Sequence, residues 1–202
     1  MFWEFVRVLE LIRLFNNPDV LFLLENVGSS RRVDKEAISE ALDCVGVPFN
    51  SVLLTPQNRN RIYWTNIEFS VPTKRKEIYL QDILEKEVDD KYYLTEKMYQ
   101  CVMSPSKGAY KNGKMTIDNS IAKTITATMH KMHRADTDNY ISTVYKPIGK
   151  TNIRRLTPIE CERLQTLPDN YTEGISDTQR YKCIGNGWTV DVLAYIFSFI
   201  VR

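Results

Sequence analysis

The order of secondary structure predicted for the first third of the chain constrains its fold more than any other feature. An apolar run predicts a strand over Val20–Val27, and the pattern after it predicts a helix from about Asp34 to Val45 that Gly46 closes. A second strand is expected near Asn50–Leu54, and the β-rich segment "RIYWTNI" follows at residues 61–67. Strand, helix and strand in this order predict an α/β protein, namely the second half of a doubly wound sheet.

The first predicted strand leads to a carboxylate. In the stretch "LFLLENVGSSRR" the apolar residues give way to Glu25 and Asn26, followed by a turn of small residues and two arginines. A crossover helix between parallel strands places Glu25 at the C-terminal edge of its strand, where sheets of this kind hold their ligands. A lone glutamate at a strand end is more often a solvated or capping residue, so this position alone does not indicate catalysis.

The opening segment "MFWEFVRVLELIRLF" predicts an amphipathic helix. Charged residues recur at every third position and occupy one face: Glu4, Arg7, Glu10 and Arg13. The other face is apolar and contains Phe2, Phe5, Val6, Leu9 and Ile12. The charges exclude a signal peptide or a membrane span, which predicts a soluble intracellular protein. A helix that begins at the first residue also leads us to expect that the element normally before it is missing or lies on another chain.

Overall charge and cysteine usage exclude more than they identify. The net charge is +2 and the pI is about 8.3, so only a local basic surface would indicate nucleic acid. Such a stretch exists between Ser104 and Arg134, with five lysines and one arginine against a single Asp118. The cysteines are scattered and have no metal-like spacing, so we expect reduced thiols in a cytoplasm, each one a small buried apolar residue: Cys44, Cys101, Cys161 and Cys183.

The pattern changes twice more along the chain. Residues 69–150 have mixed charge and a β-like segment "IAKTITATMH", which predicts a separate small domain. A helix is then expected to begin with Thr157 as N-cap, Pro158 in the first position and Glu160 completing a capping box. The apolar segment that follows "GNG" at residues 185–187 predicts a last helix that packs back on the sheet.

Five motifs occur in an informative order. They are "ENV" at 25–27, "QNRNRIYW" at 57–64, "KTITAT" at 123–128, "RRLTPIECERLQTLPDNY" at 154–171 and "GNGWTV" at 185–190. Each has an ordinary explanation as a polar loop, a turn or a scaffold helix. Together, in this order and spacing, they resemble the C-terminal portion of the DNA (cytosine-5) methyltransferases. The resemblance covers nearly the whole chain.

The resemblance implies a fold and a set of domains. It predicts the second half of a doubly wound, Rossmann-like methyltransferase sheet together with a small target-recognition domain. Residues 1–68 would form the first part of the catalytic core, and residues 69–150 the recognition domain. Residues 151–202 would return to the core. Relatives in phage and bacteria place the chain in the cytoplasm of a bacterial or phage-infected cell.

The resemblance also implies chemistry for the two polar motifs near the start. Such enzymes flip a cytosine out of the duplex and add a cysteine thiolate to its C6. The ring nitrogen N3 then needs a proton or a hydrogen-bond donor, and a carboxyl group in a half-buried pocket can supply it. Glu25 is the predicted residue, and Asn26 would fix the turn. Arg61, and to a lesser degree Arg59, would hold the cytosine O2 and a nearby phosphate.

Cofactor and DNA contacts follow from the remaining motifs. S-adenosyl-L-methionine would be bordered by Asn186, Gly187 and Trp188. Double-stranded DNA would be contacted by short polar and basic residues of the recognition region, with Gln57 more simply ordering its own loop. These predicted DNA-binding residues are Gln57, Lys123, Thr124, Thr126, His130 and Lys131.

The chain also departs from the family. The family's Phe-x-Gly-x-Gly cofactor loop and its Pro-Cys nucleophile do not occur in the 202 residues, and none of the four cysteines follows a proline. One explanation is a split enzyme, in which a separately encoded chain supplies both motifs across a large apolar interface. The alternatives are a non-catalytic regulatory paralogue, a stand-alone DNA-binding module and a truncated gene product. We expect the split enzyme, active only with its partner chain. The apolar face of the first helix and exposed strand edges should make the isolated chain prone to association and aggregation.

Overall fold

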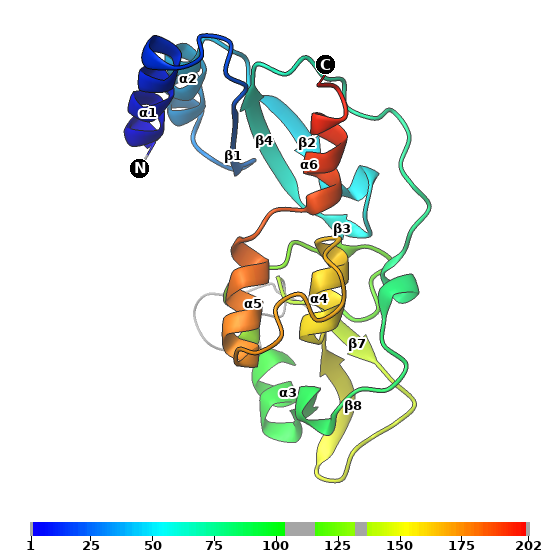
Figure 1. Ribbon diagram of the computed structural model, residues 1–202. Coiled ribbons are helices and arrows are strands. Elements are labelled where there is room, and N and C mark those ends of the chain that lie inside the picture. The colour runs from blue at the N-terminus through cyan, green and yellow to red at the C-terminus, as the bar shows by residue number, and fades with distance from the viewer. Residues whose placement is uncertain (1, 104–115, 132–136, 201–202) are drawn as a thin grey trace. The chain divides into compact units, whose positions relative to one another are not determined.

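The computed structural model describes residues 2–103, 116–131 and 137–200, which form two compact units (Figure 1). Unit 1 contains residues 1–50, 60–73 and 194–202, and unit 2 contains residues 51–59 and 74–193. Within the described residues, no helix is long and apolar enough to cross a membrane. Four residues of the predicted basic stretch lie outside the described part of the chain: Lys107, Lys111, Lys114 and Arg134.

Unit 1 is a mixed sheet flanked by helices. Its elements in chain order are α1 (Phe2–Phe15), β1 (Leu23–Val27), α2 (Arg32–Leu42), β2 (Val47–Asn50) and β4 (Asn60–Thr65). The strand order is β1-β4-β2, and β4 is antiparallel to both neighbours. β1 and β2 therefore run in the same direction and are joined through α2, as the strand, helix, strand order predicts. The insertion of an antiparallel β4 between them was not part of that prediction.

Two predicted boundaries in unit 1 are wrong, and packing explains both. α2 ends at Leu42, with Asp43 in the left-handed conformation at φ 50°, so Gly46 does not close the helix. A Cβ at Gly46 would lie 2.6 Å from side-chain atoms of both Ile62 and Trp64, so glycine is needed there for close approach to β4. The second strand is β2, which ends at Asn50, and a 3-10 helix at Ser51–Leu53 replaces its expected second half.

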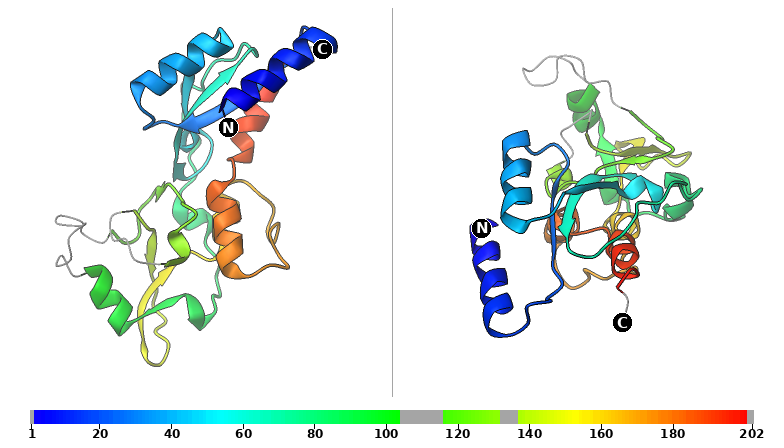
Figure 2. Two further views of the ribbon diagram at one scale, coloured as in Figure 1. Left: turned by 90° about the vertical axis from the view of Figure 1, so that its left-hand side faces the viewer. Right: turned by 90° about the horizontal axis from the view of Figure 1, so that it is seen from above.

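The two faces of this sheet have different coverings. On one face, Ile62 and Trp64 of β4 pack in a buried cluster with Val6 and Leu9 of α1. α2 adds Ile38 and Leu42 to the same cluster. Figure 2 shows α1 and α2 on that side of the sheet.

On the opposite face, Phe49 of β2 makes edge contacts with Tyr63, at 6.3 Å between ring centroids, and with Tyr195, at 5.7 Å. Tyr195 belongs to α6 (Val190–Phe197), so the apolar C-terminal helix packs on the sheet as predicted.

Unit 2 is built from short strands and helices. Its elements are β3 (Gln57–Asn58), β5 (Tyr93–Thr95), α3 (Glu96–Met103), β6 (Ala122–Lys123), β7 (Tyr140–Ser142), β8 (Lys150–Arg155), α4 (Pro158–Leu164) and α5 (Asp177–Asn186). β3 and β6 pair in parallel, while β5, β8 and β7 form an antiparallel sheet. The segment expected to be β-like is mostly not strand, because only Ala122–Lys123 pair and a 3-10 helix follows at Met129–Lys131. Residues 151–193, which the sequence interpretation assigned to the catalytic core, cluster here with residues 74–150.

The start of α4 confirms the predicted capping box. Thr157 Oγ1 accepts a hydrogen bond from the Glu160 backbone N–H at 3.1 Å, and Glu160 accepts one from the Thr157 N–H at 2.9 Å. Glu160 also binds the Arg154 guanidinium through two hydrogen bonds of 2.8 Å, with both side chains almost fully buried. The charge of this buried carboxylate is therefore matched, which anchors α4 to β8.

Candidate active site

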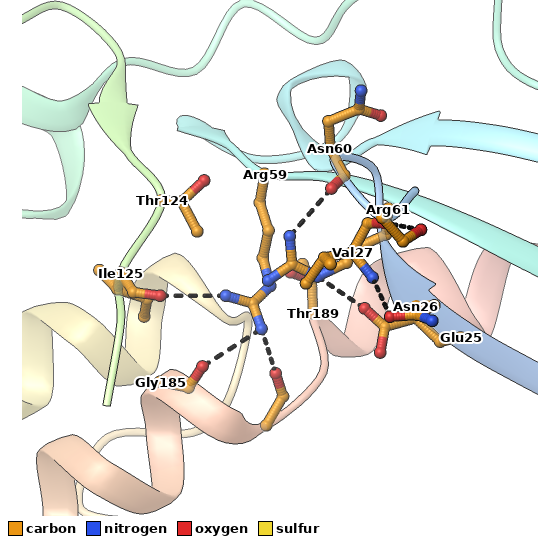
Figure 3. A network of polar contacts seen from close by, with 12 residues as sticks. Glu25, Asn26, Val27, Arg59, Asn60, Arg61, Thr124, Ile125, Gly185 and Thr189 are labelled. Atoms are coloured by element: carbon orange, nitrogen blue, oxygen red, sulfur yellow. Dashed lines mark hydrogen bonds and ion pairs between the residues drawn. The ribbon is translucent and has the colours of Figure 1, made fainter. Parts of the chain in front are cut away.

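The predicted catalytic glutamate forms an ion pair with an arginine of the neighbouring strand. Glu25 is the middle residue of β1, and the register opposes it to Tyr63 and opposes Val27 to Arg61. Glu25 and Arg61 therefore lie on the same face of the sheet, two residues apart diagonally. Arg61 Nε lies 2.6 Å from a Glu25 carboxylate oxygen (Figure 3). The side chains are 16% and 14% exposed, so the pair is largely screened from water but reachable from one side.

The turn after β1 holds this pair in place. Asn26 Oδ1 accepts a hydrogen bond from the Val27 N–H at 2.8 Å, and Gly28 N–H donates to the Asn60 carbonyl at 3.2 Å. Lys35 Nζ binds the Gly28 carbonyl at 2.8 Å. Glu25 itself lies within β1, which continues for two residues beyond it, rather than past the strand's end.

Arg59 is used differently from Arg61. Its side chain belongs to unit 2 and is buried, at 4% exposure. The guanidinium donates to the carbonyls of Ile125 at 3.0 Å, Gly185 at 3.3 Å and Gly187 at 2.8 Å (Figure 3). These three donors bind the backbone of the protein, so Arg59 is held in place by carbonyls of its own chain. The sequence contained no signal for this role.

Two buried glutamines extend the same network. Gln57 is fully buried, accepts from the Ile125 N–H at 3.0 Å and donates to the Leu164 carbonyl at 3.0 Å. Gln165 accepts from Gln57 at 3.2 Å and from Thr189 at 2.7 Å. Gln57 thus orders its loop and does not present its amide to solvent, and Gln165 is a functional candidate that sequence reasoning missed.

The predicted recognition residues lie on a short segment that this network supports. Lys123 is in β6, and Thr124 Oγ1 donates to the Asn58 carbonyl at 2.6 Å. Thr126 Oγ1 lies 3.2 Å from Thr128 Oγ1, and His130 Nδ1 lies 3.1 Å from the Ala127 carbonyl. These side chains are partly exposed, and Lys131 is exposed.

Gly185 explains how closely α5 approaches this segment. A Cβ at Gly185 would lie 2.4 Å from the Ala127 nitrogen and 2.4 Å from the Thr126 carbonyl carbon. Only glycine permits this contact without moving the backbone at Thr126 and Ala127. The glycine of the "GN" motif is thus required for packing, a role that its position in the sequence did not indicate.

The three predicted cofactor residues lie at the end of α5. Asn186 is its last residue and is exposed, Gly187 is the C-cap, and Trp188 is 46% exposed. Gly187 and Trp188 border an apolar cavity of about 230 Å³, together with Tyr171, Leu167 and others. Its lining has aromatic and aliphatic side chains and no charged one, so it fits a planar apolar ring but does not accommodate the charged groups of an amino acid.

The four cysteines are not all buried, contrary to prediction. Cys161 is buried and Cys44 is partly buried, and burial raises the pKa of both thiols. Cys101 and Cys183 are exposed. The buried thiols are poor nucleophiles, since attack needs the thiolate.

Comparison with known proteins gives the family. The model of C-5 cytosine-specific DNA methylases matches residues 1–202, the whole chain. This protein belongs to that family. Among relatives, the type II methyltransferase M.NlaX of Neisseria lactamica is 31% identical over 218 residues, covering 97% of this chain and 66% of its own length. The type II methyltransferase M1.ScrFI of Lactococcus lactis subsp. cremoris is 29% identical over 216 residues, covering 96% of this chain and 53% of its own length.

Solved structures of methyltransferases have the same mixed α/β fold. The crystal structure of the S. pombe Dnmt2 methyltransferase has a TM-score of 0.70 at 17% identity, covering 98% of this chain and 70% of that one. The Entamoeba histolytica methyltransferase EhMeth has a TM-score of 0.66 at 18% identity, with the same two coverages. The chain thus spans 53% and 66% of the two type II methyltransferases and 70% of each of the two solved chains.

Proposed function

We propose that this chain is one subunit of a heteromeric DNA cytosine-5 methyltransferase. The half-buried ion pair of Glu25 and Arg61 carries the proposal, because it places an acceptor and a planar set of donors side by side on a sheet of this family. A separately encoded chain would supply the Pro-Cys nucleophile and most of the cofactor site. These motifs do not occur in the 202 residues.

Glu25 and Arg61 would act on the flipped base. As the thiolate adds to C6, negative charge develops on the ring, and a proton or hydrogen bond at N3 stabilises it. Glu25, protonated from solvent as the ion pair opens, would donate to N3, and Arg61 would donate to the cytosine O2. Since the two side chains now bind each other at 2.6 Å, entry of the base would exchange part of this ion pair for contacts to N3 and O2.

S-adenosyl-L-methionine would supply the methyl group. Its planar adenine suits the apolar cavity beside Gly187 and Trp188, and Asn186 is exposed at the same helix end. The cavity has no charged lining residue for the amino-acid part of the cofactor. The remaining contacts would come from the partner chain.

DNA recognition would rest on Lys123, Thr124, Thr126, His130 and Lys131. The buried Gln57 accepts from the Ile125 N–H, and the buried Arg59 donates to the Ile125 carbonyl. In this assignment Gln57 and Arg59 position the recognition segment rather than contact DNA themselves. The division into a catalytic core at 1–68 and 151–202 and a recognition domain at 69–150 remains part of this proposal.

The test is transfer of a labelled methyl group from S-adenosyl-L-methionine to duplex DNA. It compares the chain alone with the chain co-expressed with the polypeptide from the same genome that carries Pro-Cys and Phe-x-Gly-x-Gly. We expect transfer only in the mixture. Transfer by the chain alone would make one of its own cysteines the nucleophile. Inactivity of both would instead favour a non-catalytic regulatory paralogue.

A further inference from the structure

The outward face of α1 is apolar. Five of its large hydrophobic side chains are between 41% and 77% exposed: Trp3, Val8, Leu11, Leu14 and Phe15. The sequence interpretation assigned the outward face to charged residues. Glu4 and Arg7 do lie exposed and paired with each other, but apolar groups surround them. We call these five residues the α1 outer face.

The inward face of the same helix already has its partners. Val6 and Leu9 are buried in the unit 1 cluster with Phe22, Ile62 and Trp64. The helix therefore packs on its own sheet through Val6 and Leu9, and the α1 outer face is left free of that sheet. Large apolar side chains exposed together on a helix whose other face is already packed indicate an interaction surface.

The spacing on the α1 outer face suits a second helix or a flat apolar surface. Val8, Leu11 and Phe15 follow the i, i+3, i+7 pattern of a seam, and Leu14 and Trp3 flank it. Glu4 and Arg7 lie among them and neutralise each other, and the exposed Glu10 adds a negative charge. Because Arg7 is already paired and Glu10 is negative, this surface has no excess positive charge to match a phosphate backbone, which argues against DNA as its partner.

We propose that the α1 outer face is the docking surface for the chain that supplies the nucleophile. This inference rests on the proposed function. That chain must pack on unit 1, because unit 1 holds Glu25 and Arg61, and α1 belongs to the same unit. The matched relatives carry a third to nearly half of their length beyond the part that this chain covers, which is enough for a substantial apolar interface. A second copy of this chain would bring no Pro-Cys.

The experiment uses the full chain with the polypeptide from the same genome that carries Pro-Cys. The test variant is Leu11→Glu with Leu14→Glu. The matched control is Val33→Glu with Val45→Glu, which adds the same charges at apolar residues of 61% and 82% exposure outside the α1 outer face. We expect the test variant to raise the dissociation constant for the partner about 100-fold. The control should leave it within about twofold of the wild-type value.

Fluorescence provides a second measurement. Trp3 is 66% exposed, so docking should shift its emission to shorter wavelength, and Trp3→Phe should remove that part of the shift while methyl transfer persists. Circular dichroism of each variant reports whether it is folded. At a saturating concentration of the partner chain, the test variant should recover methyl transfer, because the substitutions lower only its affinity for the partner.

The outcomes separate this inference from the proposed function. If wild type and partner transfer no methyl group, the proposed function fails. If they transfer it but the test variant binds the partner as tightly as wild type, only the docking surface fails. Self-association of the wild-type chain that the test variant abolishes, with partner binding unchanged, would assign the α1 outer face to a second copy and overturn the inference.

Discussion

Arg59 and Arg61 are separated by one residue, yet the protein uses them for opposite purposes. Arg61 binds the carboxylate of Glu25 and is 14% exposed, so its charge is available to a ligand that displaces that partner. Arg59 is buried and binds three backbone carbonyls, two of them beside the Gly-Asn turn and one in the recognition segment. One side chain is suited to chemistry, and the other to holding the backbone.

The contrast shows that one short motif can contain both a residue available to a ligand and a residue that stabilises the backbone. Alternate residues of a strand point to the same side only while the strand continues. Here Arg59 lies between two separate strands in different units, Gln57–Asn58 and Asn60–Thr65, so it does not share the side of Arg61. The chain therefore distributes the arginines of one short motif between two units. Three experiments can break or sharpen this contrast, and a fourth applies the same comparison of buried and exposed groups to two glutamates.

The largest effect is expected from Glu25→Gln in the assembled enzyme. The change keeps the shape of the side chain but removes the carboxyl group proposed to contact N3, so methyl transfer should fall about 10²- to 10⁴-fold. Unfolding and partner binding should be unchanged. The control is Glu36→Gln, which removes another glutamate paired with an arginine, at 2.6 Å, on exposed α2. Turnover of Glu25→Gln within a factor of two of this control would exclude Glu25 from the site.

The next effect concerns stability. Arg59→Leu should lower the free energy of unfolding by about 3 kcal/mol, because the buried carbonyls of Ile125 and Gly185 lose this donor and that of Gly187 keeps only Gln165. Arg59→Lys should recover little, since an ammonium cannot reproduce the planar fork. Urea denaturation measures both. A stability loss equal to that of Arg61→Leu would remove the contrast between the two arginines.

Arg61→Ala should give the converse result. We expect retention of the flipped base to weaken about 10- to 100-fold, while the free energy of unfolding changes by only about 1 kcal/mol, because Glu25 can be hydrated from its exposed side. Fluorescence of 2-aminopurine at the target position reports base flipping. An unaltered signal and rate would place Arg61 outside the base pocket.

The smallest effect is expected in the pH dependence of the free energy of unfolding, compared between variants of two glutamates. Burial acts to raise the pKa of Glu162, but hydrogen bonds from Thr172 and Arg180 outweigh it and lower that pKa. A lowered folded-state pKa means that this stabilisation is complete above the unfolded value of about 4.3 and is lost as the pH falls through the folded value. The unfolding free energy of Glu162→Gln should therefore fall less steeply below about pH 4.3 than that of the exposed control Glu173→Gln. Parallel curves would contradict this.

Several features were predictable because they depend on neighbours in the sequence. The capping box of Thr157 and Glu160 needs only a three-residue spacing, and the structure confirms it. The helix at Phe2–Phe15 and the order of β1, α2 and β2 follow from apolar periodicity. The position of Glu25 within β1 was close to prediction for the same reason, although the strand continues past it.

Other features depend on contacts that no local pattern encodes. Arg59 and Gln57 look like an ordinary polar loop, and their burial follows from a meeting with Ile125 and Leu164, which are 66 and 107 residues away from them respectively. Gly46 was expected to end a helix, but the approach of Trp64 is what requires it. The outward exposure of Leu14 and Phe15 likewise depends on which side of α1 the sheet covers.

The residues and their order therefore indicated the family, the order of helices and strands in unit 1, and which side chains could carry the chemistry. Tertiary structure alone decided which arginine pairs with Glu25 and which one binds the backbone. The physical reason is that periodicity and capping are local energies, whereas burial and the pairing of charges are properties of surfaces that distant segments form together. A guanidinium has the same charge and donors at both positions, and its surroundings determine what they bind.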